Sequence, residues 1–149
     1  MRIEDEIKGR FRNEYHKGFI NLSYTARSLS YDFFRELKKH GLTEQQYNVL
    51  RILRGFKDEA PLNVGFIKER MLDRNPDVSR LVDRLQEKGL VTSSSNSLDK
   101  RQRSVDITPR GLDLLASLLA WEKHVETLLG NLTLDEVTEL NRILDKIRE

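Results

Sequence analysis

The chain has 149 residues, of which 38% are apolar and 34% charged, and it contains no cysteine. This size suits one domain with its own core, and this balance argues against both a disordered chain and a membrane protein. The lack of cysteine excludes disulfides, thiol nucleophiles, thiol-based redox sensing and zinc sites built from thiolates. No run approaches the roughly 18 apolar residues of a membrane-spanning helix, and the first residues lack the apolar stretch of a signal peptide. We therefore expect a cytoplasmic protein with no membrane partner.

The charge is distributed unevenly along the chain. Residues 111–149 carry eight acidic and four basic side chains, a net charge of −4, whereas residues 1–110 carry about +6 within a whole-chain charge of +2. A basic body with an acidic tail indicates a polyanionic partner on one side of the molecule.

The first segment, residues 3–39, is predicted to be helical, with a break near Gly18 as the alternative to one continuous helix. From Phe19 to Leu37 the apolar residues recur at a spacing close to a heptad. Further aromatic residues widen this apolar surface beyond what a small core needs. The surface is predicted to form a subunit interface, and packing within the chain's own core is the alternative.

Two more helices are expected before residue 73. His40 and Gly41 end the first segment, and Thr43 and Gln46 form a capping box that begins the next helix. Residues 55–61 form a linker, and residues 62–72 are expected to form a helix of similar length.

The clearest helix signal lies in residues 76–88. One apolar stripe at i, i+3, i+4 and i+7 consists of Val78, Leu81, Val82 and Leu85. Asn75 is the expected N-cap, Pro76 the first helical residue, and Gly89 the left-handed residue that ends the helix. The opposite face consists of Arg80, Asp83 and Glu87, flanked by Ser79 and Arg84.

Residues 73–75 are too few for anything but a turn. The helices predicted over residues 62–72 and 76–88 therefore form a helix-turn-helix. The second helix of such a pair is the one that enters a DNA major groove. The alternative is a merely solvated polar face, because charges on an amphipathic helix often mean no more than that.

After Gly89 the apolar period changes to that of strands. Residues 90–93 and 105–107 are predicted to form a β-hairpin around a polar, serine-rich turn. The returning arm carries three cations, Lys100, Arg101 and Arg103, which suit phosphate and minor-groove contacts. The predicted fold is therefore mainly α with a small β-hairpin wing, that is, a winged helix-turn-helix.

Two apolar helices are expected to complete the chain. Thr108 and Pro109 begin one that runs to a stop at Gly130 and Asn131, and a second staple and capping box begins the final helix near Thr133. Both are too apolar to stand alone, and together with the N-terminal helix they are predicted to form a dimer interface.

This order of elements resembles the MarR (multiple-antibiotic-resistance regulator) family of transcription regulators over nearly the whole length. The resemblance is carried by residues 78–91 (VSRLVDRLQEKGLV), by Asp99-Lys100-Arg101, by residues 105–111 (VDITPRG) and by Gly41-Leu42-Thr43. It implies a homodimeric, sequence-specific regulator, a repressor, that grips a pseudo-palindromic site in double-stranded DNA.

The resemblance also implies a division of the chain. Residues 1–40 and 109–149 would supply the dimerisation helices, and residues 41–108 the DNA-binding lobe. The implied DNA-binding residues are Arg74, Asn75, Asp77, Ser79, Arg80, Arg84, Asp99, Lys100, Arg101 and Arg103. In the wing, Arg101 would enter the minor groove steadied by Asp99, with phosphate contacts from Lys100 and Arg103. Helix periodicity alone indicates Ser79, Arg80 and Arg84, while Asp77 and Asp83 would read cytosine amino groups or hold those arginines in place.

Other kinds of site find little support. The three histidines, His16, His40 and His124, are scattered without metal-ligand spacing, and no phosphate-binding loop or nucleophile motif occurs. We expect no cofactor, no metal and no enzymatic activity. Many relatives of the resembled family respond to small aromatic anions, and Tyr15, Phe19, Tyr24 and Phe33 are candidates for the walls of such an effector cleft. Interface packing is the competing interpretation, so no ligand-binding residues are assigned.

A rival hypothesis comes from a different class of function. A winged helix can act as a protein-interaction module, with its basic wing docked on an acidic partner and no DNA bound. Selection of a two-fold symmetric duplex would favour the regulator, and the absence of any selection would favour the module.

Overall fold

The computed structural model describes residues 1–95 and 102–149. The helices are α1 (Ile3–Ile7), α2 (Glu14–Lys39), α3 (Glu44–Gly55), α4 (Val64–Lys68), α5 (Val78–Glu87), α6 (Pro109–Ser117), α7 (Leu119–Thr127) and α8 (Leu134–Ile147), with a 3-10 turn η1 (Lys57–Glu59). The strands are β1 (Leu62–Asn63), β2 (Val91–Ser94) and β3 (Ser104–Ile107). The mainly helical fold with a small β-hairpin, predicted from the sequence, is confirmed.

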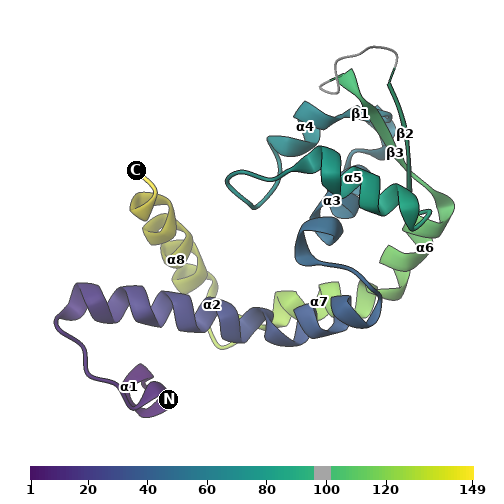
Figure 1. Ribbon diagram of the computed structural model, residues 1–149. Coiled ribbons are helices and arrows are strands. Elements are labelled where there is room, and N and C mark those ends of the chain that lie inside the picture. Colours follow the sequence, from purple (N-terminus) through teal and green to yellow (C-terminus); the bar gives the residue numbers. More distant parts are fainter. Residues whose placement is uncertain (96–101) are drawn as a thin grey trace.

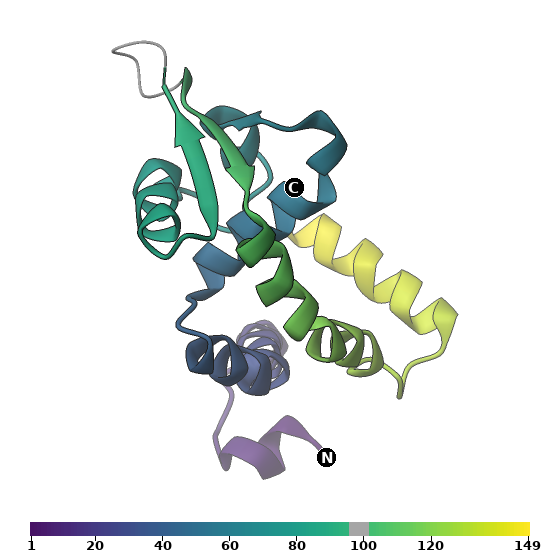
Figure 2. The same cartoon turned by 90° about the vertical axis from the view of Figure 1, so that its right-hand side faces the viewer.

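The molecule has two parts (Figure 1). One is a lobe made of α3, α4, α5 and the three strands, and the other is an arm made of the long α2 with α7 and α8. Helix α6 leads from the end of β3 to the arm. The end of β2 and the start of β3 lie at the tip of the lobe, on the side away from α2 and α7 in both views (Figures 1 and 2).

The sheet is antiparallel, in the order β1-β3-β2. Strand β1 was not predicted, and the helix expected over residues 62–72 is wrong in extent. Leu62 pairs with Val105 and is only 3% exposed, and the Asn63 side chain accepts a hydrogen bond from the Phe66 N–H at 2.7 Å. The helix therefore begins at Val64 and has five residues. A strand partner far along the chain prevails here over the local helical pattern.

The core lies in the lobe. It is formed by side chains from α3, α4, α5, the strands and α6, with Leu50, Leu53, Ile67, Val82, Leu85, Val105, Leu115 and Leu118 among its fully buried members. The predicted apolar stripe of α5 is confirmed in its buried members, while Leu81 packs at the margin of this core.

Several of the local signals predicted at helix ends are confirmed. Thr43 with Gln46 and Thr133 with Glu136 form capping boxes, and Pro109 occupies the first turn of α6. Gly89 has φ +71°, and the Leu90 N–H donates to the Leu85 carbonyl at 3.0 Å, which completes a Schellman cap.

Gly111 meets a steric requirement of a different kind. A Cβ on this residue would lie 2.4 Å from the Leu90 carbonyl oxygen, which real Cβ atoms do not approach so closely. Only glycine therefore lets the first turn of α6 pack against the start of the hairpin.

Two predicted helices are interrupted at positions other than those expected. The N-terminal break lies at residues 8–13 rather than near Gly18, and the Asn13 side chain caps α2 by accepting from the His16 N–H at 2.9 Å. The helix expected to run from Pro109 to Gly130 ends and restarts at Leu118, which is fully buried in the lobe. Helix α6 packs on the lobe and α7 belongs to the arm, so the interruption at Leu118 allows the chain to change direction between these two parts.

The arm exposes large apolar side chains. They include Tyr15 (92% exposed), Phe19 (66%), Leu134 (82%) and Ile147 (64%). All of α8 lies within the described chain, and none of its residues is buried. Over the residues that the structure describes, no helix is long and apolar enough to cross a membrane.

Candidate nucleic-acid interface

Helix α5 begins two residues later than predicted. The N-cap is Asp77, whose Oδ1 accepts a hydrogen bond from the Arg80 N–H at 3.2 Å, so Asn75 is not the cap and Pro76 is not a helical residue. Pro76 is instead buried just before the helix, and the connection from α4 spans residues 69–77 rather than a three-residue turn. Helix α5 nevertheless buries the predicted face, with Val78, Val82 and Leu85 at 2% exposure or less.

The outer face of α5 carries both signs of charge. Arg80 and Arg84 are exposed as predicted, and Arg80 forms no ion pair with any residue of the described ranges. Arg84 pairs with Glu87 at 3.2 Å, with both side chains more than half exposed. An exposed pair of this kind contributes at most about 1 kcal/mol, so Arg84 can readily exchange its partner for another anion.

Arg103 binds the wing to α5. Its Nη1 donates to the Asp83 carboxylate at 2.6 Å and to the Ser79 carbonyl at 3.3 Å, and its Nη2 donates to the Gln86 side chain at 3.3 Å. Its Nε and Nη2 both reach the Ser93 hydroxyl on β2, at 3.0 and 2.8 Å. We call these five residues the Arg103 bracket.

The bracket changes the interpretation of two predicted residues. The Arg103 side chain is only 15% exposed and its donors are engaged within the protein, which favours a positioning role over the phosphate contact predicted from the sequence. Asp83 pairs with Arg103, so it does not hold Arg80 or Arg84 in place. The wing strands and the outer face of α5 are thereby joined into one surface.

The other residues predicted to bind DNA lie outside the bracket or take part in it at its edge. Arg74 and Asn75 are exposed in the connection before α5, and Ser79 is half-buried on the first turn of the helix. Asp99, Lys100 and Arg101 lie outside the described residues, so the Asp99–Arg101 pair stays a prediction.

Replacing Asp77 by alanine is expected to lower the free energy of unfolding by about 1 kcal/mol, because the cap of α5 is lost. Asp77→Asn is the matched control, since asparagine caps equally well without a charge. Urea denaturation of both variants measures the difference. A loss as large for Asp77→Asn as for Asp77→Ala would show that the charge, not the cap, is what α5 needs.

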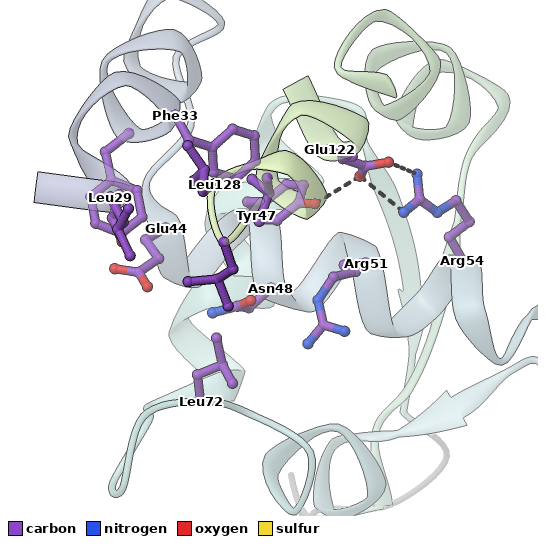
Figure 3. Close-up of a pocket in the computed structure, with 14 residues that line it drawn as sticks. Leu29, Phe33, Glu44, Tyr47, Asn48, Arg51, Arg54, Leu72, Glu122 and Leu128 are labelled. Carbon is purple, nitrogen blue, oxygen red and sulfur yellow. Dashed lines mark hydrogen bonds and ion pairs between the residues drawn. The ribbon is translucent and has the colours of Figure 1, made fainter. Parts of the chain in front are cut away.

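A cavity of about 520 Å³ lies between the lobe and the arm (Figure 3). Its apolar wall comes from α2, α7 and the residues near it, including Leu29, Phe33, Phe34, Val125, Leu128 and Leu129. Its polar side comes from α3, with Glu44, Asn48 and Arg51, and Leu72 from the connection before α5 completes the lining. Of the four aromatic residues considered for an effector cleft, only Phe33 lines it.

The polar side of the cavity contains groups without partners. Asn48 is 2% exposed, and its Nδ2 donates no hydrogen bond to any atom of the described chain. Arg51 forms no ion pair there either. Burial raises the pKa of Glu44, and the nearby Asp73 carboxylate raises it further. An unpaired buried donor beside a guanidinium favours an acceptor or an anion in this place.

A second polar group closes one side of the cavity. The Tyr47 hydroxyl donates to Glu122 Oε1 at 2.7 Å, and Arg54 forms a two-pronged pair with the same carboxylate at 2.9 and 3.2 Å. Sequence reasoning did not identify these residues or the cavity. The signal that could have indicated them is Asn48, a polar residue in the middle of a run of buried positions.

Of the three histidines, His40 lies beside a carboxylate, with 3.6 Å between its Nε2 and Glu36 Oε1. In the parts of the chain that are described, no group of three or more histidine, aspartate or glutamate side chains is arranged to hold a metal ion.

A helix pair followed by a hairpin that packs on its second helix defines a winged helix-turn-helix protein. The model of the MarR family matches residues 40–102. The regulator MgrA of Staphylococcus aureus is 31% identical over 110 residues, which cover 74% of this chain and 72% of MgrA. The regulator MhqR of Bacillus subtilis is 25% identical over 132 residues, covering 88% of this chain and 89% of MhqR.

A solved structure shows the same fold. BpsR of Bordetella bronchiseptica, whose DNA binding is regulated by 6-hydroxynicotinic acid, superposes with a TM-score of 0.72 at 20% identity, over 89% of this chain and 99% of BpsR. The chain belongs to the MarR family. It is a DNA-binding transcription regulator, and its relatives are regulators rather than enzymes.

Proposed function

We propose that the protein is a homodimeric repressor of MarR type that binds a pseudo-palindromic site in double-stranded DNA. Helix α5 would enter the major groove and the wing the adjacent minor groove. The observation that carries this proposal is the Arg103 bracket, because it holds the exposed outer face of α5 and the wing strands in one surface. A repressor that binds chromosomal DNA in this way would act in the cytoplasm.

Within this surface, the roles follow from exposure and pairing. Arg80, with no ion-pair partner among the described residues, would read base edges, and Arg84 would leave Glu87 for a base or a phosphate. Arg74 and Asn75 would contact the backbone beside the groove. Asp77 and Ser79 would act mainly by beginning the helix. In the wing, Arg101 would enter the minor groove beside Asp99, with Lys100 on a phosphate.

Dimerisation is supported by the exposed apolar side chains of the arm. Side chains such as Tyr15, Leu134 and Ile147 are more than 60% exposed, and α8 buries none of its residues in a single chain. Large exposed apolar surfaces mark protein interfaces. Residues 1–40 and 109–149 would therefore supply the dimerisation helices, with α6 of the second segment packed on the lobe, and residues 41–108 would form the DNA-binding lobe.

The proposal is tested by titrating a labelled random-sequence duplex with the protein at several salt concentrations. We expect measurable affinity that falls steeply with salt, and Arg101→Ala should make the log–log slope shallower by about 0.9, the value for one lost phosphate contact. Unchanged affinity of Arg101→Ala for every duplex would contradict the wing assignment. A complete lack of duplex binding would instead favour the protein-interaction module, which no observation on this chain otherwise supports over DNA.

The cavity supports a second element of the proposal, release from DNA by a small aromatic anion. Its apolar wall suits a ring, and Asn48 and Arg51 offer donors to a carboxylate or phenolate. A ligand at one hundred times its Kd should stabilise the protein by about 2.7 kcal/mol. Thermal melting with aromatic carboxylic acids measures this, and Arg51→Ala should abolish the shift while Arg35→Ala, at an exposed site outside the cavity, should retain it. Equal shifts in both variants would contradict the assignment.

A further inference from the structure

The lobe and the arm are joined by polar contacts to one carboxylate. Glu122, near the start of α7, accepts the Tyr47 hydroxyl and both Nη atoms of Arg54, and both of these partners lie on α3 (Figure 3). Among the residues described, Glu122 is the one position on α7 with side-chain hydrogen bonds to the lobe. We call Tyr47, Arg54 and Glu122 the α3–α7 clamp.

The clamp is sheltered from water. Tyr47 is 8% exposed, and the side chains of Glu122 and Arg54 are 17% and 34% exposed. Burial raises the pKa of the Tyr47 hydroxyl, and its hydrogen bond to Glu122 raises it further, so this group remains a donor throughout the physiological range. Hydrogen bonds to a charged group in such surroundings are stronger and more directional than those on an open surface.

The two helices that the clamp joins belong to different parts of the molecule. Helix α3 is embedded in the lobe, with Val49 and Leu50 at 0% exposure. Helix α7 begins directly after Leu118, the residue that separates it from α6, and at this point the lobe ends and the arm starts. The clamp therefore bridges the junction about which the lobe would tilt relative to the arm.

The geometry points to a specificity-determining role: the α3–α7 clamp sets the tilt of the DNA-binding lobe on the dimerisation helices and so selects the spacing between half-sites. This inference depends on the proposed dimeric DNA-binding function. Two copies of α5 must lie about 34–36 Å apart to enter successive major grooves on one face of a duplex. A rotation at the junction moves α5 as well, because α5 packs on α3 in the same core.

Two variants remove the clamp in different ways. Tyr47→Phe deletes only the hydroxyl and keeps the ring, which packs edge-on against the Phe33 ring with 5.0 Å between the ring centroids. Glu122→Gln keeps the size of the side chain and removes the charge that pairs with Arg54. Tyr24→Phe is the matched control, because the Tyr24 hydroxyl also donates to a glutamate, Glu6, at 3.0 Å, but joins α1 to α2.

The full-length variants would be titrated against the symmetric duplex that the wild-type protein selects, the same duplex with one or two base pairs inserted between its half-sites, and an isolated half-site. For Tyr47→Phe and Glu122→Gln we expect near wild-type affinity for the half-site. Affinity for the selected spacing should fall about tenfold, and the ratio between the selected and altered spacings should shrink, because a lobe free to tilt is less preorganised. Tyr24→Phe should keep both the affinity and the ratio.

The outcomes separate the inference from the function on which it depends. Wild-type protein that selects a symmetric site, together with clamp variants that keep its spacing ratio, would overturn the clamp inference alone. An equal loss of affinity at every spacing and at the half-site would also overturn it, because that is the effect of general destabilisation. Wild-type protein that binds no symmetric duplex would overturn the proposed function, and the inference with it.

Discussion

Arg103→Ala is expected to weaken binding to the specific duplex by about tenfold or more and to lower the free energy of unfolding by about 2 kcal/mol. The physical reason is the loss of the bracket. Without the guanidinium, the Asp83 carboxylate, the Ser79 carbonyl and the Gln86 amide lose the donor that they share. Strand β2 then loses the hydrogen bonds between Ser93 and Arg103, and the wing is held less firmly beside α5, through the direct hydrogen bond from the Ser93 hydroxyl to Gln86.

A comparison of two acidic residues on α5 distinguishes the bracket from simple charge repulsion. Asp83→Ala removes a negative charge from the outer face of α5, so repulsion alone predicts tighter DNA binding. The bracket predicts weaker binding, because Arg103 loses its 2.6 Å partner. Glu87→Ala is the control, since it removes the same charge from the same face and only frees Arg84. Fluorescence anisotropy measures the affinity of the wild-type protein and of both variants for one duplex. Tighter binding by Asp83→Ala would contradict the role of the bracket.

Arg80→Ala is expected to relax sequence preference more than it lowers affinity for random DNA. An arginine that reads a guanine edge contributes about 1–3 kcal/mol of discrimination against the wrong base. The measurement is the set of affinities for single-base variants of the selected site. At the position that Arg80 reads, the penalty for the wrong base should nearly disappear, and the penalties elsewhere should stay.

Arg74→Ala supplies the comparison for Arg80. Arg74 is an exposed arginine a few residues earlier, placed for a backbone contact, so its removal should weaken all duplexes by a similar factor and leave the preferences intact. If Arg80→Ala behaves in the same uniform way, Arg80 contacts phosphate and the assignment of base reading to it is wrong.

The sequence predicted the parts of the fold that depend on local chemistry. The capping box at Thr43, the left-handed Gly89 and the buried stripe of α5 each follow from a few neighbouring residues, and each is confirmed. The exposed position of Arg80 and Arg84 follows from the same helical period.

Most of the parts that were missed depend on residues far apart in the chain. Strand β1 exists because Leu62 finds Val105, and α6 ends at Leu118 because that side chain is buried in the lobe while α7 joins the arm. The start of α5 is a subtler case. Asn75 and Asp77 are both good capping residues, and the helix begins after Asp77, with Pro76 buried outside it.

The site was predictable to a similar degree. The sequence indicated three wing cations, but not which of them would turn inward, because the partners of Arg103 depend on how the hairpin packs on α5. The cavity and the α3–α7 clamp draw on segments from α2 to α7, so no single stretch signals them.

Selection of bound duplexes from a random-sequence pool by the full-length protein tests the central claim most directly. A dimer with two lobes held at a set tilt should enrich a two-fold symmetric site whose half-site centres lie about 10–10.5 base pairs apart, one turn of the duplex. Enrichment of a single asymmetric element, or of no sequence at all, would contradict it.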